Sequence, residues 1–247
     1  MSEVLANTDN QILTLTLNRP EKQNAITREM YQNLADAINE ANGDFGIRAI
    51  LITSSSQNFT AGNDLFDFLN ASPVEEGSPV LNFLGAIHNL TKPLLAAVSG
   101  NAVGIGTTML FHCDVVVAAP GTKFSMPFVN LGLVPEAGSS LLFPRLVGYQ
   151  RASKIFLTGE PFGPEEALDM GLIAEISNSP LEAAKSIAMK IGAQPPNAVI
   201  QTKALLKSEL HEKVSAVMRA EGELFQMALQ SDEAREAFMN FLAKKSK

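Results

Sequence analysis

Two glycine-bearing turns contain the residue types that could do chemistry in this sequence. They are residues 61–65 (AGNDL) and residues 100–106 (GNAVGIG). Small residues let backbone N–H groups approach a ligand oxygen closely. Two such N–H donors converging on one oxygen stabilise negative charge that develops there during a reaction. Each turn taken alone is equally typical of a structural role, because glycine commonly ends a strand without binding anything.

The elements that must position these turns alternate between strands and helices. Apolar runs predict strands, and Thr27 is a predicted N-cap for a helix that stops at Gly43. Because the carboxyl ends of parallel strands are where ligands bind in open α/β sheets, both turns fall at a favourable place. We predict an α/β core over residues 1–190 and a helical region over 191–247. The predicted strands are 12–17, 49–53, 93–98, 114–119 and 172–177; the predicted helices are 80–90, 103–112, 137–147, 150–157, 164–170, 180–191 and 196–242.

Composition narrows the possible partners. Of 247 residues, 46% are hydrophobic, which is enough for one large core. The 19 Lys and Arg against 26 Asp and Glu give a net charge of −7, which argues against nucleic acid as a partner. No apolar stretch is long enough to predict a membrane span. The start lacks the pattern of a signal peptide. With Cys113 as the single cysteine, we expect a cytoplasmic protein without disulfides.

Common cofactor and catalytic motifs are absent from the sequence. No phosphate-binding P-loop occurs, and Met109 stands where a dinucleotide-binding glycine would follow Gly104 and Gly106. The segment after Gly138 lacks the closing glycine of a nucleophile elbow. The three histidines have no metal-ligand spacing. We therefore expect no metal ion and no separate cofactor.

Taken together, six motifs resemble the enoyl-CoA hydratase/isomerase (crotonase) superfamily. The resemblance runs from about residue 10 to the C-terminus, in the order and spacing of the family. It implies a crotonase-like spiral of ββα units with a helical C-terminal oligomerisation region, and an acyl-CoA thioester as substrate. The motifs are residues 18–25 (NRPEKQNA), 59–65 (FTAGNDL), 92–100 (KPLLAAVSG), 113–114 (CD), 124–127 (FSMP) and 131–135 (LGLVP).

The resemblance also implies roles for individual residues. The backbone N–H groups of Asn63 and Ile105 match the oxyanion hole of the family, although the family more often has glycine at the second position. Phe225 and Lys244 match C-terminal positions that contact CoA; a core residue and a solvated tail charge are the alternatives. The other positions implied to bind CoA, the thioester or the acyl chain are Lys22, Ala25, Ala61, Gly62, Asp64, Leu65 and Phe128.

The carboxylates distinguish the reactions within this family. Hydratases use two glutamates to position water and deliver a proton. Here those positions hold Thr108 and Phe128, and neither residue is a general base near neutral pH. Glu136 instead resembles the single catalytic glutamate of the Δ3,Δ2-enoyl-CoA isomerases. The alternative for Glu136 is an exposed residue in the first turn of a helix, favoured there by the helix dipole.

The sequence therefore predicts an isomerase that moves a C3 double bond of an unsaturated acyl-CoA to C2. One glutamate would shuttle the proton, and the backbone donors would hold the dienolate oxygen. Another crotonase-type reaction, such as weak hydration of an enoyl-CoA, and a non-catalytic acyl-CoA-binding protein are the alternatives. The resemblance also implies a homotrimer or a dimer of trimers, formed through the C-terminal helices.

Overall fold

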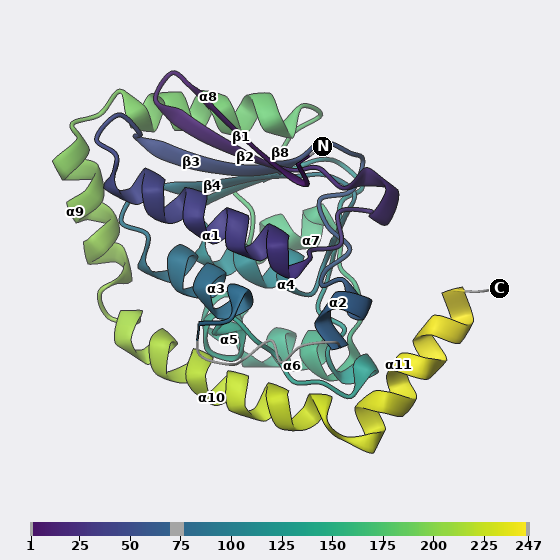
Figure 1. Ribbon diagram of the computed structural model, residues 1–247. Coiled ribbons are helices and arrows are strands. Elements are labelled where there is room, and N and C mark those ends of the chain that lie inside the picture. Colours follow the sequence, from purple (N-terminus) through teal and green to yellow (C-terminus); the bar gives the residue numbers. More distant parts are fainter. Residues whose placement is uncertain (1, 70–76, 246–247) are drawn as a thin grey trace.

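A six-stranded sheet forms the centre of the protein (Figure 1). The computed structural model describes residues 2–69 and 77–245. The edge strand β1 is antiparallel to β2, and every other pair of neighbours is parallel, which confirms the mostly parallel sheet. In sheet order, the strands are β1 (Val4–Asp9), β2 (Ile12–Leu17), β3 (Ala49–Ser54), β4 (Leu94–Val98), β6 (Val115–Ala118) and β8 (Glu175–Ile176).

The two faces of the sheet are covered by different helices. Successive side chains of a strand point to opposite faces, so Ala49 and Leu51 of β3 pack on one side and Ile50 and Ile52 on the other. The first side is covered by α8 (Pro180–Gly192). The second contains the larger core, with α1 (Arg28–Gly43) and α3 (Pro79–Asn89) packed against each other. The figure shows α8 on one face and this pair on the other.

Helix α1 begins at the predicted cap. The Thr27 hydroxyl accepts a hydrogen bond from the Met30 N–H at 3.2 Å, which satisfies one of the free donors of the first turn. Met30, Tyr31 and Leu34 are buried, in keeping with the apolar spacing of the sequence. This burial fixes the direction in which the Tyr31 hydroxyl points.

The single helix predicted over 103–112 is wrong at its start. Residues Asn101–Val103 form β5, which pairs with β7 (Lys123–Ser125) in a small parallel sheet. Gly104 has a φ of +56°, and its N–H donates to the Ser125 carbonyl at 2.8 Å. Helix α4 (Ile105–Thr108) and the 3₁₀ helix η2 (Met109–His112) follow. The apolar run was compatible with both structures, and pairing with a distant strand decided between them.

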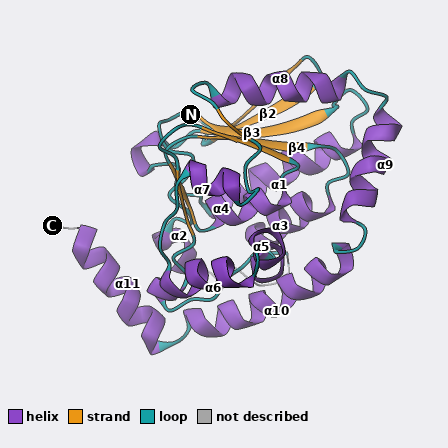
Figure 2. Ribbon diagram, turned by 180° about the vertical axis from the view of Figure 1, so that it is seen from behind, coloured by secondary structure: helices purple, strands orange, loops and turns teal. Residues whose placement is uncertain are grey.

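The last third of the chain is helical, and its final three helices lie along the outside of the molecule (Figure 2). The run predicted over 196–242 is interrupted twice. Lys203 joins α9 to the core, because its Nζ lies 2.7 Å from Asp114 Oδ2 and 2.6 Å from the Lys92 carbonyl. The domain boundary at residue 190 stays a prediction. The helices are α5 (Ser139–Val147), α6 (Tyr149–Thr158), α7 (Pro164–Asp169), α9 (Pro196–Lys207), α10 (His211–Leu229) and α11 (Asp232–Lys245).

Candidate active site

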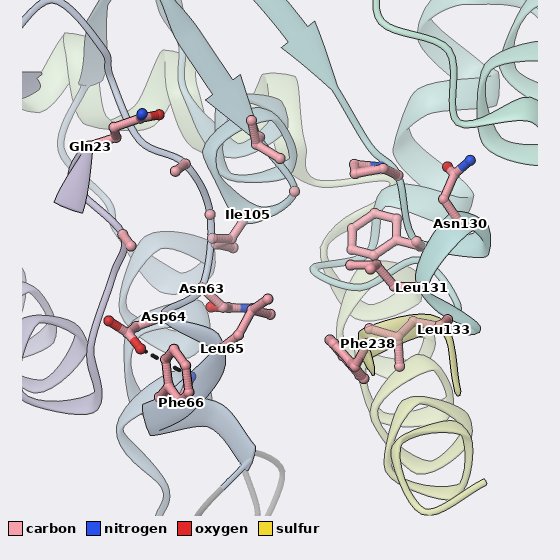
Figure 3. A pocket seen from close by; sticks show the side chains of 18 of the residues that line it. Gln23, Asn63, Asp64, Leu65, Phe66, Ile105, Asn130, Leu131, Leu133 and Phe238 are labelled. Carbon is pink, nitrogen blue, oxygen red and sulfur yellow. Dashed lines mark hydrogen bonds between the residues drawn. The ribbon is translucent and has the colours of Figure 1, made fainter. Parts of the chain in front are cut away.

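A cavity of about 740 Å³ opens beside the small sheet. Its walls come from distant parts of the chain: the 3₁₀ helix η1 (Pro20–Lys22), the turn before α2 (Leu65–Leu69), the start of α4, the 3₁₀ helix η3 (Val129–Leu131), α10 and α11. Figure 3 shows Asn63 and Ile105 on one side, with Leu131, Leu133 and Phe238 facing them. The predicted site residues that line the cavity are Lys22, Ala25, Ala61, Gly62, Asn63, Asp64, Leu65, Ile105, Phe128 and Phe225.

The backbone at Asn63 leaves an N–H group available. Ile26 donates its N–H to the Gly62 carbonyl at 2.8 Å and accepts from the Asp64 N–H at 2.9 Å. Because the residues on both sides of Asn63 face Ile26, the N–H of Asn63 points the other way. Gly62 makes this approach possible: its φ is +89°, and a Cβ there would lie 2.9 Å from the Val103 carbonyl oxygen.

The second donor is at the start of α4. Ile105 is the first residue of this helix, where backbone N–H groups have no partner within the helix. Within the described ranges, no backbone acceptor is recorded for the N–H of either Ile105 or Asn63. Isoleucine in place of glycine leaves the backbone donor intact, and the Ile105 side chain is buried. The two predicted donors therefore line one cavity and are able to bind a ligand oxygen.

An ion pair joins two of the sequence motifs behind this wall. Arg19 Nη1 lies 2.6 Å from Asp64 Oδ2 and donates to the Ala25 carbonyl at 3.0 Å. Burial alone would raise the pKa of Asp64, but the bond from Arg19 and the N–H groups of Phe66 and Asp67 lower it overall. The carboxylate of Asp64 thus holds the turn at the start of α2 and stays ionised.

Glu136 is not part of the cavity lining. Its partly buried carboxylate accepts a hydrogen bond from the Thr108 hydroxyl. Thr108 is the last residue of α4, whose first residue borders the cavity, so one helical turn of about 5 Å separates the two ends. Burial is the main cause that raises the pKa of Glu136 to about 8; the Thr108 bond opposes it and the charge of Glu221 adds to it.

The position of Glu136 also differs from the alternative role, that of an exposed residue in the first turn of a helix. Helix α5 begins at Ser139, with Gly138 as its N-cap, so Glu136 lies in a turn before the helix. A first-turn position would have left the carboxyl exposed to solvent, whereas the turn directs it to Thr108. Glu136 is therefore not the exposed first-turn residue of the alternative, and its catalytic role stays a prediction.

Much of the remaining cavity lining is apolar, although Asn130 and Asn240 also belong to it. It includes Phe128, Leu133 and, from the C-terminal helices, Phe225 and Phe238. Phe225 is buried on α10, as the core alternative expected, and it also borders the cavity; its contact with CoA stays a prediction. Lys244 belongs to α11, but its side chain lies outside the described residues.

Sequence reasoning missed two residues around Glu136. The Tyr31 hydroxyl donates to Asn63 Oδ1 at 2.5 Å, and its pKa is raised well above the usual value by burial first and by the Glu136 charge second. Glu221 accepts hydrogen bonds from the turn that follows Glu136. Neither residue belongs to a motif, and helical periodicity identifies both only as members of a packed face.

The described ranges show neither a metal site nor a membrane-spanning helix. They contain no group of three or more His, Cys, Asp or Glu side chains that could hold a metal ion. No helix there is both long and apolar enough to cross a membrane. The expectations of no metal ion and no cofactor stay predictions.

Comparison with known proteins agrees with this geometry. A family model described as "Enoyl-CoA hydratase/isomerase" matches residues 7–247. Enoyl-CoA delta isomerase 2 of Rattus norvegicus is 34% identical over 99% of this chain and 64% of its own length. The 2,3-dehydroadipyl-CoA hydratase of Escherichia coli is 32% identical over 100% of this chain and 98% of its own length. The structure of Pseudomonas aeruginosa OdaA is 41% identical and superimposes with a TM-score of 0.95. The match covers 98% of this chain and 99% of the OdaA chain.

These relatives cover both reactions of the family. One is named as an isomerase and the other as a hydratase at similar identity, so their names identify the fold and the general chemistry but leave the reaction open. The fold class and the resemblance predicted from the sequence are confirmed. The chain belongs to the enoyl-CoA hydratase/isomerase family, the crotonase superfamily.

Proposed function

We propose that this family enzyme is an isomerase that converts 3-enoyl-CoA to trans-2-enoyl-CoA. The observation that carries the proposal is the Glu136 carboxyl, which has a raised pKa and accepts a hydrogen bond from Thr108. Thr108 lies one helical turn along α4 from the Ile105 donor, and so it connects this carboxyl to the cavity wall. The positions that hold the two glutamates of a hydratase are Thr108 and Phe128. A single base suits proton transfer between two carbons better than addition of water.

In the proposed reaction, the backbone N–H groups of Asn63 and Ile105 form an oxyanion hole for the thioester oxygen. Glu136 removes a proton from C2, and the electron pair moves into a dienolate whose charge lies largely on that oxygen. The protonated Glu136 then returns a proton to C4, and the double bond becomes C2–C3. No atom is gained or lost, and the carboxylate is regenerated. A pKa near 8 makes Glu136 a stronger base than an ordinary carboxylate.

The rest of the cavity suits a CoA thioester. Lys22 is exposed at one end and offers a positive charge to the phosphates of the nucleotide, and Ala25 lies close to it in the lining. Phe128 and Leu133 offer an apolar surface to the acyl chain. We also propose a role for Phe225 in binding, because it borders this cavity from α10.

An assay of purified protein with 2- and 3-enoyl-CoA substrates of several chain lengths tests the function. We expect isomerisation of 3-enoyl-CoA, and we expect Glu136→Gln to lower kcat by at least about 100-fold, because a general base contributes that much or more. Full activity of the variant would exclude Glu136 as the base. Rapid hydration of 2-enoyl-CoA by the wild type would favour the hydratase alternative, and thioester binding without turnover would favour a binding protein.

We further propose that the chain forms a homotrimer or a dimer of trimers. Large apolar side chains remain exposed on the C-terminal helices, including Leu205 and Leu206 of α9 and Leu224 and Met227 of α10, each more than half exposed. Apolar surface of this kind is typical of a protein interface. A cytoplasmic location, favoured by the sequence, is part of the same proposal.

A further inference from the structure

The turn that carries Glu136 has an unusual backbone conformation. The Ser139 N–H donates to the Glu136 carbonyl at 3.1 Å, and both central residues have positive φ, +62° at Ala137 and +72° at Gly138. This is the pattern of a type I′ turn. Glycine adopts it freely, but alanine pays a steric cost for the left-handed conformation. Contacts from elsewhere in the fold must therefore hold Ala137 in place.

Two buried groups from other elements supply those contacts. His112 of η2 lies with Nε2 2.7 Å from the Ala137 carbonyl oxygen, and since a carbonyl only accepts, Nε2 carries the hydrogen. Burial lowers the pKa of His112 to about 3, so the ring is neutral. On the other side, Glu221 of α10 accepts from the Gly138 N–H at 2.6 Å.

Glu221 makes further bonds at the same place. It accepts from the Ser140 N–H at 2.9 Å and from the Ser140 hydroxyl at 2.5 Å. Its carboxylate therefore binds the free donors at the start of α5, where negative charge is favoured. The side chain is 6% exposed and does not border the cavity. Its position is thus explained by the turn and not by contact with a ligand.

We propose that Glu221 is a positioning residue for the isomerase reaction: it holds the turn that presents Glu136, and its negative charge acts on the Glu136 carboxyl. This inference rests on the proposed role of Glu136 as the base. A helix of the C-terminal region thereby holds the geometry of a carboxyl that belongs to the α/β core, and it adds to the effect of burial on the basicity of that carboxyl.

The charges around Glu136 support an electrostatic effect of Glu221. From α4, the Thr108 hydroxyl favours the ionised form of Glu136, and from α10 the charge of Glu221 disfavours it. Tyr31 of α1 and His112 of η2 are both neutral near pH 7, because burial raises the pKa of the first and lowers that of the second. Glu221 is therefore the side chain, among those described, whose charge raises the pKa of Glu136. Burial raises the pKa of Glu221 itself, and the hydrogen bonds from Ser140 and Gly138 oppose this rise by favouring the ionised form.

The test compares Glu221→Gln with Glu223→Gln, which makes the same charge change at an exposed position two residues along α10. We expect kcat/KM of the wild type to rise with pH to a midpoint near 8, the pKa of Glu136. Glu221→Gln should move this midpoint to lower pH and lower the plateau kcat by about 10- to 100-fold, because a small displacement of a base is costly. KM should stay unchanged. Glu223→Gln should resemble the wild type.

A second measurement needs no turnover. Glu136 has an ordinary pKa of 4.5 when unfolded and about 8 when folded, so the unfolding free energy should fall, relative to Glu136→Gln, as pH rises between these values. The upper edge of this window reports the pKa of Glu136 in the folded state. Adding Glu221→Gln to both proteins should move that edge to lower pH, whereas Glu223→Gln should leave it in place.

These readouts separate the two proposals. If the wild type does not isomerise 3-enoyl-CoA, the proposed function fails, and the edge of the stability window still decides whether Glu221 acts on Glu136. If the wild type isomerises but Glu221→Gln leaves the midpoint, the plateau kcat and the edge unchanged, the inference about Glu221 is overturned. Glu221→Asp keeps the charge with a shorter reach, so we expect it to retain the wild-type midpoint while lowering kcat.

Discussion

At the scale of single residues, Thr108 partly offsets the effect of burial on the pKa of Glu136. Thr108 occupies a position that matches a catalytic glutamate of the hydratases. In this protein its hydroxyl donates a hydrogen bond to the Glu136 carboxyl. The bond stabilises the charged form of Glu136, whereas burial and Glu221 stabilise the neutral form. The outcome is a carboxyl with a pKa of about 8, which is a stronger base than usual but is mostly protonated at pH 7.

Removing the Thr108 hydroxyl should shift the pKa of Glu136 in the opposite direction to the removal of the Glu221 charge. Thr108→Val deletes the donor, so the pKa of Glu136 should rise and the midpoint of the kcat/KM profile should move to higher pH. Activity at pH 7 should fall, with recovery at alkaline pH. Thr108→Ser, which retains the hydroxyl, is the control and should keep the wild-type profile. A shift to lower pH in the valine variant would contradict the assigned hydrogen bond.

At the scale of elements, Arg19 links the N-terminal turn to the wall of the cavity. Its guanidinium contacts Asp64, the Ala25 carbonyl and, through Nε at 2.9 Å, Glu3 of the segment before β1. The planar guanidinium spreads its N–H donors over a wider, fixed fork than the compact ammonium of lysine does, which suits three separate acceptors. Because Asp64 in turn binds the first N–H groups of α2, Arg19 holds residues 61–65 from behind.

Arg19→Lys should therefore affect binding and stability together. We expect KM for the enoyl-CoA to rise several-fold, and the free energy of unfolding to fall by about 1–3 kcal/mol, since a largely buried charge loses hydrogen bonds. Arg151→Lys is the matched control: the Arg151–Asp169 pair is 2.8 Å long but exposed, so its contribution is at most about 1 kcal/mol. Urea unfolding and steady-state kinetics measure both quantities. Equal effects of the two variants would contradict this account.

At the scale of the whole molecule, the C-terminal helices border the candidate site of their own chain. Phe225 and Phe238 border the cavity from α10 and α11, and Glu221 holds the turn beside Glu136. The same region also exposes apolar side chains, such as Leu205 and Leu206 of α9. One helical region thus contributes side chains to the cavity and also carries exposed apolar side chains, the surface on which the proposed assembly rests.

The exposed apolar side chains of the C-terminal helices lead to a prediction about the mass of the protein in solution. Sedimentation velocity of the wild type at micromolar concentration should give three or six times the mass of the chain. Leu205→Glu combined with Leu206→Glu should weaken the association, because charged residues are depleted from the buried centre of interfaces. Lys190→Gln, an exposed change on α8, is the control. A wild-type monomer at all concentrations would rule out the proposed assembly.

Local patterns predicted much of the fold, and their failures have physical causes. The strands at 12–17 and 49–53 and the cap at Thr27 were predictable because alternation and capping are short-range effects. Strand β1 was missed because five of its six side chains are exposed, so it has no apolar pattern. The two residues of the turn between β1 and β2, Asn10 and Gln11, both have positive φ. Asn10 was the sequence feature that could have indicated this hairpin turn, because asparagine tolerates positive φ.

The sequence by itself determined the family, the α/β class and the motifs that line the cavity, because short segments of fixed residue types specify these turns. Only the tertiary structure decided what surrounds Glu136. Glu221 reaches Gly138 across 83 residues of chain, and Thr108 reaches Glu136 across 28. Basicity depends on burial and on charges brought together by folding, and no spacing along the chain encodes which distant side chains will become neighbours.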